Sequence, residues 1–344
     1  MWQTAGQEHI VGFLTESILR NRMAHAYLLV GPPHVGKMTL AIDLARALNC
    51  TAENAPCGIC RTCQRIVQGK HPDVVMIDKN TGRDPSERKK AAEISIDAIR
   101  EFVQKGASLP PYEGKYKVYI IEDAELMSVE ASNCLLKTLE EPPPHVVLIL
   151  LTTEEGALLP TVISRCQRFE LKPVPLAVIE KRLTEIHGLA PERVKLLSKL
   201  SGGCLGWALL SAGDVSFLKS REDRIDEFVT LINKNWDERL LYIQQLPSDR
   251  QVIAQILELW ISWCRDVLLI KYNCDEVVAN IDRIADLKAW AGMLTVPEIK
   301  DFIDCLNTAI ANLLYNANLH LILEVLMLDM PRKEKRADSL YFAV

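Results

Sequence analysis

A short glycine-rich loop between an apolar run and a helical stripe constrains the fold of this chain more than any other feature. Residues 26–30 are apolar, Gly31 and Gly36-Lys37 follow at the spacing of a phosphate-binding loop, and apolar residues then recur at helical intervals to Leu48. In such a loop, backbone N–H groups and the helix N-terminus surround an anion, and the lysine reaches its outer phosphates. The pattern predicts a strand, a nucleotide-binding loop and a helix, in that order.

The residue after the lysine departs from this motif. A working loop places Ser or Thr there to bind Mg²⁺, whereas this chain has Met38, whose thioether is a poor ligand for a hard cation. Thr39 follows one position later and faces about 100° away on an ideal helix. We expect a loop that holds a nucleotide, or that descends from one that did, without its usual metal ligand. Its candidate residues are Gly31, Pro32, Gly36, Lys37, Met38 and Thr39.

Further candidates for a nucleotide site are two acids and a threonine that lie at the ends of two apolar runs later in the chain. Glu122 and Asp123 come directly after the run 118–121, where a P-loop ATPase keeps its metal-binding and water-activating carboxylates. The usual order is Asp then Glu, and the inversion here changes the reach of each group by a methylene, which argues against hydrolysis. Thr152 ends the run 146–151, where a residue sensing γ-phosphate would lie. The alternative is a pair of ordinary exposed acids at a strand end.

Four cysteines lie close together just after the predicted loop and helix. Three of them have the spacing CxxCxxC, and the fourth precedes them by seven residues. Four thiolates around one tetrahedral ion make a closed structural zinc site with no open position for chemistry. Ordinary reduced thiols are the alternative, and a redox CxxC fits a group of four less well. The predicted zinc ligands are Cys50, Cys57, Cys60 and Cys63.

The apolar runs alternate with helical stripes up to about residue 173, which is typical of a parallel sheet covered on both faces. Residues 5–24 and the segment from Ile94 to Val103 are expected to be helical, the latter after a short extended piece. Beyond residue 173 the patterns are helical alone. We therefore expect an α/β core followed by all-α segments. A chain of 344 residues is long enough for two or three domains.

Five motifs together make the chain resemble the clamp-loader branch of the AAA+ ATPases, over roughly residues 5–210. The motifs are Gly31-Pro32-Pro33-His34-Val35-Gly36-Lys37, the cysteine group, His71-Pro72-Asp73-Val74, Leu135-Leu136-Lys137-Thr138-Leu139-Glu140-Glu141-Pro142 and Ser164-Arg165-Cys166. The resemblance implies an AAA+ core at 1–173 with the zinc module at 50–63, a helical lid at 174–214 and a helical collar at 215–344. It also implies that Arg165, flanked by Ser164 and Cys166, is an arginine finger for a neighbouring subunit's ATP site.

Hydrolysing subunits of that family carry a loop Ser or Thr, an Asp-Glu pair and a lid arginine, and this chain departs at all three places. Met38 replaces the hydroxyl, Glu122-Asp123 inverts the acids, and Gly206-Trp207 stands where the lid would offer Arg-Asp. The resemblance thus implies a stator without intrinsic ATPase activity. Its expected partners are other subunits of a hetero-pentamer, the sliding clamp and, through the assembly, primer–template DNA.

Two other functions stay open. The near-complete loop with Lys37 also suits an ATP-hydrolysing motor subunit of the same loader, which is an enzyme. A zinc-containing nucleic-acid-binding protein is the second alternative, but a net charge of −5 and 6% aromatic residues argue against it. We find neither a signal peptide nor an apolar run of membrane-spanning length, so the expected location is the cytoplasm.

Overall fold

The computed structural model describes residues 1–84, 86, 93–314 and 317–332. The chain forms two compact units. The first consists of Met1–Arg182 together with Gly203–Trp207, and the second of Leu183–Gly202 together with Ala208–Val344. Part of the predicted collar, residues 333–344, lies outside the described residues. The division into core, lid and collar stays a prediction.

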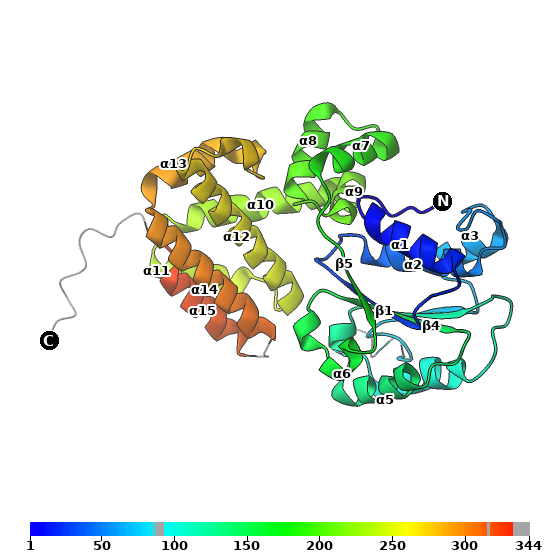
Figure 1. Ribbon diagram of the computed structural model, residues 1–344. Coiled ribbons are helices and arrows are strands. Elements are labelled where there is room, and N and C mark those ends of the chain that lie inside the picture. Colours follow the sequence, from blue (N-terminus) through cyan, green and yellow to red (C-terminus); the bar gives the residue numbers. More distant parts are fainter. Residues whose placement is uncertain (85, 87–92, 315–316, 333–344) are drawn as a thin grey trace. The chain divides into compact units, whose positions relative to one another are not determined.

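A parallel sheet forms the centre of the first unit (Figure 1). Its strand order is β2-β3-β4-β1-β5, and each neighbouring pair is parallel. The loop-bearing strand β1 therefore lies between β4 and β5, with its buried residues contributing to both faces. The strands are β1 (Ala26–Val30), β2 (Val74–Ile77), β3 (Lys117–Ile121), β4 (Val146–Thr152) and β5 (Gln167–Glu170).

Helices cover both faces of this sheet, as the unbroken apolar runs predict. Leu28 of β1 belongs to the apolar core under α5 and α6, whereas Leu29 belongs to the core under α1 and α2. Figure 1 shows the two helix layers on opposite sides of the strands. The α/β core is thereby confirmed. Its helices are α1 (Glu8–Leu19), α2 (Lys37–Asn49), α3 (Arg61–Val67), α4 (Ile96–Ala98), η2 (Ile99–Lys105), η3 (Ala124–Leu126), α5 (Val129–Glu140), η4 (Glu155–Ala157) and α6 (Pro160–Ile163).

Two predicted helices differ from the structure in extent or winding. The helix expected over residues 5–24 is shorter, because Gly6 and Asn21 adopt positive φ angles of 74° and 53° on either side of α1. The helix expected from Ile94 to Val103 begins as α4, and continues as the π-helix η2. Ser95 caps it by accepting a hydrogen bond from the Ala98 N–H.

The second unit is all-helical among its described residues, and α7 and α9 each begin in the first unit and end in the second. Its apolar core is centred on Trp260, Trp263 and Trp290, each buried, with Phe228 stacked on Trp260 at a centroid distance of 4.4 Å. The all-α part of the fold is thereby confirmed. The helices are α7 (Leu176–His187), α8 (Pro191–Leu200), α9 (Leu205–Gly213), α10 (Val215–Leu231), α11 (Trp236–Gln245), α12 (Arg250–Lys271), η5 (Asp275–Val277), η6 (Ile281–Arg283), α13 (Ile284–Met293), α14 (Val296–Leu314) and α15 (Leu319–Asp329).

A buried arginine ties three of these helices together. Arg239 on α11 is fully buried, and its guanidinium donates to carbonyl groups at the ends of α10 and α15. Helix ends leave such carbonyls without intrahelical partners, so the arginine supplies donors that the backbone lacks. Burial lowers the pKa of Arg239 to about 10, which leaves it charged at neutral pH. The acceptors are the carbonyl oxygens of Leu231, Ile232, Met327, Met330 and Pro331.

No helix within the described ranges has both the length and the apolar character needed to cross a membrane.

The Arg239 contacts predict a large stability effect. We expect Arg239→Met to lower the free energy of unfolding of the second unit by about 3 kcal/mol or more, because several buried carbonyls lose their donors. Denaturant unfolding followed by tryptophan fluorescence measures this change. Lys288→Ala is the control, because it removes an exposed ion pair to Asp275 and costs about 1 kcal/mol or less. Equal stability of the two variants would contradict the assigned role of Arg239.

Candidate functional site

The predicted phosphate-binding loop lies at the carboxyl edge of the sheet. It leaves β1 at Gly31 and enters α2 through Gly36, whose φ of 110° is the left-handed conformation that glycine tolerates best. The Gly31 N–H donates to the Thr152 carbonyl at 3.2 Å, so the end of β4 lies beside the start of the loop. The strand, loop and helix expected from the sequence are confirmed as local structure.

Lys37 contacts its own loop. Its ammonium group donates to the carbonyl oxygens of Gly31 at 2.5 Å and Pro32 at 3.0 Å. Desolvation lowers the pKa of Lys37, and the charges of Glu125 and Asp123 oppose that shift. The only cation of the motif therefore faces a cluster of acids at the same edge of the sheet.

The first turn of α2 offers no well-placed metal ligand. Met38 is half-buried and packs against the apolar core beneath α1 and α2, whereas Thr39 is exposed. A thioether in the core and a hydroxyl directed elsewhere do not replace the Mg²⁺ ligand of a hydrolysing loop.

The two predicted acids follow β3, next to the loop. Glu122 and Asp123 are both exposed, and Asp123 has a positive φ of 48°. Desolvation raises the pKa of each carboxyl group, and a neighbouring carboxylate adds to each shift. Thr152 is fully buried, and its hydroxyl oxygen accepts the Glu154 N–H at 3.1 Å. The structure thus places Thr152 beside the loop with its side chain committed to the local backbone.

Glu125 was missed by the sequence reasoning. It lies in the 3₁₀ turn η3 and accepts hydrogen bonds from the Thr153 hydroxyl at 2.7 Å and the Thr153 N–H at 3.2 Å. It is also the acid with the largest electrostatic effect on Lys37. Its position two residues after the Glu122-Asp123 pair was the available signal, but a single acid in a turn is a weak one.

The first turn of α9 packs on the phosphate-binding loop. The Gly206 N–H donates to the His34 carbonyl at 2.9 Å, and a Cβ atom at position 206 would lie 2.7 Å from that oxygen. Only glycine fits without a shift of the backbone. Position 206, where the resemblance predicts the place of a lid arginine, therefore has no side chain and contacts the loop directly.

Arg165 lies at the opposite edge of the sheet. It precedes β5, whose first residue Gln167 pairs with Tyr27 near the start of β1, whereas Gly31 follows the end of β1. The three residue steps from Tyr27 to Val30 alone span about 10 Å. The guanidinium and the phosphate-binding loop of one chain are thus separated by the height of the sheet.

The Ser164-Arg165-Cys166 turn is held by local contacts. One terminal guanidinium nitrogen of Arg165 donates to the Thr161 carbonyl at 3.0 Å, and the other donates to the Glu140 carboxylate at 2.8 Å. The Ser164 hydroxyl donates to the Thr161 carbonyl as well. Cys166 packs against the core under α5 and α6, and burial raises the pKa of its thiol to about 12. Cys166 is therefore a packing residue, and Arg165 is the group turned to the surface.

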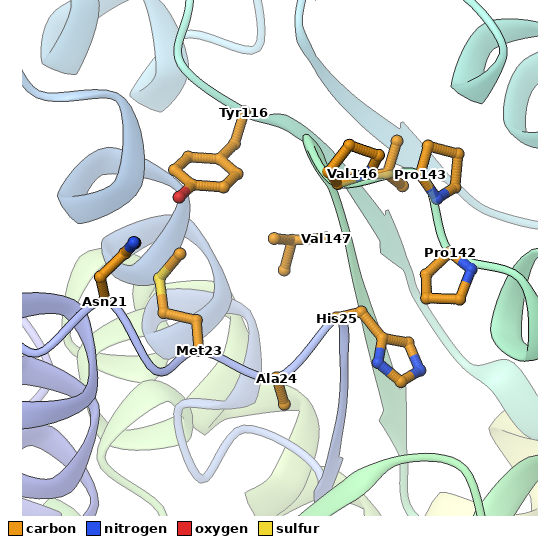
Figure 2. A pocket seen from close by; sticks show the side chains of 10 residues that line it. Asn21, Met23, Ala24, His25, Tyr116, Pro142, Pro143, Val146 and Val147 are labelled. Carbon is orange, nitrogen blue, oxygen red and sulfur yellow. The ribbon is translucent and has the colours of Figure 1, made fainter.

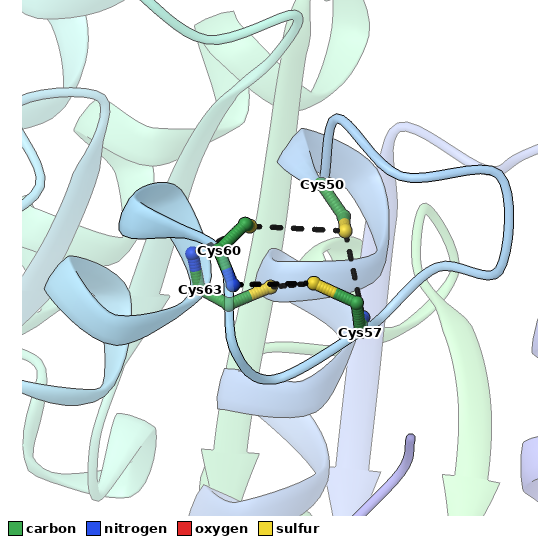
Figure 3. A group of neighbouring side chains, drawn as sticks. All are labelled: Cys50, Cys57, Cys60 and Cys63. Atoms are coloured by element: carbon green, nitrogen blue, oxygen red, sulfur yellow. Dashed lines mark hydrogen bonds between the residues drawn. The ribbon is translucent and has the colours of Figure 1, made fainter.

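The four predicted zinc ligands come together at the start of α3 (Figure 3). Their sulfur atoms all lie within 4.8 Å of one another, a separation that one tetrahedral ion can bridge. The Cys60 N–H donates to Cys57 Sγ at 3.3 Å and lowers the pKa of that thiol to about 6. Cys50 and Cys63 are buried, so the group is closed toward the protein. These residues fit a structural zinc ion.

Arg46 links this cysteine group to the start of the chain. It is 1% exposed, and it donates to Asp43 Oδ1 at 2.8 Å. The other carboxylate oxygen of Asp43 accepts the Gln3 and Thr4 N–H groups. On its other side, Arg46 lies so close to Gly58 that a Cβ there would be 2.7 Å from the guanidinium. A positive charge beside the thiol group suits a Zn(Cys)₄ centre, which carries a net charge of −2.

A separate pocket of about 300 Å³ lies at the amino edge of the sheet (Figure 2). His25 precedes β1 and Val146 begins β4, so the pocket is remote from the phosphate-binding loop. Figure 2 shows the prolines after α5 and Tyr116 on its walls. The lining residues are Asn21, Met23, Ala24, His25, Tyr116, Pro142, Pro143, Pro144, Val146 and Val147.

The cysteine geometry predicts bound metal. We expect one zinc ion per chain in metal analysis of the purified protein, and a loss of metal in Cys57→Ser and Cys63→Ser because each removes a ligand. Cys274→Ser is the control, since Cys274 is exposed and lies outside the group. A folded native chain free of zinc and iron would contradict the site.

The Gly206 contact predicts a position-specific cost. We expect Gly206→Ala to lower the free energy of unfolding by about 1–3 kcal/mol, because the added methyl group meets the His34 carbonyl. Gly213→Ala in the same helix has open space for its methyl group and should be neutral or stabilising. Denaturant unfolding of both variants provides the comparison. A stable Gly206→Ala protein would show that α9 does not pack tightly on the loop.

Comparison with known proteins identifies the family. Residues 6–175 match the family model described as DNA polymerase III, delta subunit. The chain is 30% identical to DNA polymerase III subunit delta' of Bacillus subtilis, covering 94% of this chain and 95% of that one. It is 29% identical to subunit tau of the same organism, covering 88% of this chain and 56% of that one. A solved Thermotoga maritima protein related to the gamma subunit aligns over 93% of this chain and 99% of its own, with 21% identity and a TM-score of 0.45. The chain belongs to the delta-prime-type family of DNA polymerase III clamp-loader subunits.

Proposed function

We propose that this chain is the non-hydrolysing delta-prime stator of a DNA polymerase III clamp loader, and that Arg165 acts as an arginine finger on a neighbouring subunit's ATP. The observation that carries the proposal is the position of Arg165. It lies at the amino edge of the sheet, and the chain's own phosphate-binding loop lies at the carboxyl edge. A guanidinium in that place cannot reach its own loop, so a phosphate bound by it would belong to another polypeptide.

Four features in and around the chain's own loop support the absence of hydrolysis. Met38 supplies no Mg²⁺ ligand, and Lys37 donates to the loop carbonyls. Gly206 presses against His34 where a lid arginine would serve a nucleotide. The order Glu122-Asp123 also reverses the usual Asp-Glu order, which shifts each carboxylate at a site where rates depend on sub-ångström geometry. Binding of ATP without turnover is compatible with this arrangement.

Assembly is supported by an exposed apolar stripe in the second unit. Leu321, Val325 and Leu328 of α15 are 58%, 48% and 53% exposed and recur at helical spacing. Exposed apolar side chains along one face of a helix are suited to contact with another protein. We assign the stripe to the collar of a hetero-pentamer, with residues 1–173, 174–214 and 215–344 as core, lid and collar, and with zinc as a structural ion.

In this role the chain contributes one group to its neighbour's reaction. During γ-phosphoryl transfer, negative charge spreads over the equatorial oxygens, and a guanidinium placed there stabilises it. The effect of such a finger is about 10³–10⁵ in rate, or about 4–7 kcal/mol. Hydrolysis in the neighbour then depends on assembly, which couples ATP turnover to the loading of the sliding clamp onto primed DNA by the cytoplasmic polymerase (nucleotidyltransferase) holoenzyme.

An ATP-hydrolysing motor subunit is the second candidate. The identity of 29% to subunit tau over 88% of this chain favours it, together with the retained Lys37. ATP turnover by an assembly in which this chain supplies the only intact phosphate-binding loop separates the two candidates. The zinc-containing nucleic-acid-binding alternative has the weakest support, given the net charge of −5.

The proposal predicts the effect of one substitution. Arg165→Ala should leave the assembly intact and slow ATP turnover at the neighbouring site by about 10³ or more, because the finger acts on the transition state. Phosphate release from the reconstituted loader, with primed DNA and clamp, measures it. Arg168→Ala is the matched control, since Arg168 is a nearby exposed arginine bound to Glu155. Unchanged turnover in Arg165→Ala would refute the finger role.

A further inference from the structure

Arg165 is held by two different helices. Glu140, the last residue of α5, accepts one terminal nitrogen at 2.8 Å, and Thr161 of α6 accepts the other through its carbonyl at 3.0 Å. The residues lie 25 positions apart in the chain, so the fold brings the carboxylate to the guanidinium. Because a guanidinium is planar, two anchors on separate nitrogens favour one position and one orientation of its plane.

The geometry leaves donors for a phosphate. Ser164 Oγ and the Thr161 carbonyl both accept from one terminal nitrogen, and Glu140 accepts from the other. Among the described contacts, no acceptor is found for the Nε–H of Arg165 or for the second hydrogen on its Glu140-bound nitrogen. Both are available to an oxygen of a phosphoryl group that approaches from solvent.

We propose that Glu140 is a positioning residue for Arg165, which holds the guanidinium in the orientation that meets the neighbouring subunit's triphosphate. This inference rests on the proposed function of Arg165. The side chains of Arg165 and Glu140 are 35% and 51% exposed, so the ion pair is a partly solvated one. Such a pair shifts side-chain populations only about two- to five-fold. It is strong enough to favour one orientation and weak enough to let the guanidinium engage a phosphate of higher charge.

Glu141 provides a matched control. It is the next residue, it is also an exposed glutamate, and it contacts the rest of the chain through its backbone N–H, which donates to the Lys137 carbonyl. Glu141→Ala therefore removes a carboxylate from the same surface without removing an acceptor from Arg165.

The test measures kcat and KM for ATP in the reconstituted loader with primed DNA and clamp. Glu140→Ala should lower kcat about two- to five-fold and leave KM unchanged, because orientation of the finger matters in the transition state. Glu140→Gln should recover part of the loss, since its amide oxygen still accepts from the guanidinium. Glu141→Ala should match the native chain. Gel filtration and circular dichroism confirm that each variant assembles and folds.

A double variant separates positioning from a structural effect. Arg165→Ala and Arg165→Ala/Glu140→Ala should turn over ATP equally slowly, because Glu140 has no guanidinium left to orient. A further loss in the double variant would overturn the inference, and so would faster turnover in Glu140→Ala, which would mean that the carboxylate masks the finger.

The two proposals fail in different ways. If Arg165→Ala slows turnover while Glu140→Ala does not, the positioning role is wrong and the finger role stands. If Arg165→Ala turns over ATP at the native rate, the finger role falls and the positioning role falls with it.

Discussion

Parallel pairing of β5 with β1 is the constraint on which the functional geometry depends. The register joins Tyr27 to Gln167 and Val30 to Glu170, so the chain enters both strands at one edge of the sheet and leaves both at the other. Every loop that follows a strand therefore gathers at the carboxyl edge, and every loop that precedes one gathers at the amino edge. The phosphate-binding loop and the Ser-Arg-Cys turn fall on opposite edges for this reason alone.

The two edges of the sheet differ in how far their functional groups are occupied by contacts within the chain. At the carboxyl edge, Lys37 donates a hydrogen bond to a carbonyl of its own loop, and Gly206 packs closely against His34. At the amino edge, Arg165 is more than a third exposed and makes contacts that solvent can compete for. The phosphate-binding loop of this chain thus contacts other parts of the same chain, whereas the Arg165 cation is partly exposed at the surface. This arrangement suits the proposed action on a neighbouring subunit.

Most of the features that could be predicted from the sequence depend on residues close together in the chain. The phosphate-binding loop, the apolar strands and the CxxCxxC group follow from short-range spacing, and the structure reproduces each of them. The contacts that refine the site join distant residues. The pairing of Glu140 with Arg165 depends on where α5 and α6 end in space, and nothing in either segment specifies it. Arg46 is a second such case, because its burial depends on contacts with Asp43 and Gly58 that no local pattern specifies. The π-winding of η2 likewise has no sequence signature that distinguishes it from an α-helix.

The edge position of β5 has a mechanical meaning. This four-residue strand is the last in the sheet order and pairs with β1 on one side, and the helix before it, α6, is also four residues long. Short elements with one-sided support open at lower free energy than the central strands. We therefore expect the turn between them to open at lower free energy than β1 and β4 do. The charged residues Arg168 and Glu170 on β5 also disfavour the pairing of a strand from another chain with this edge of the sheet. The guanidinium proposed to serve a neighbouring subunit is thus carried at the edge of the sheet, where local opening costs less free energy than at its centre.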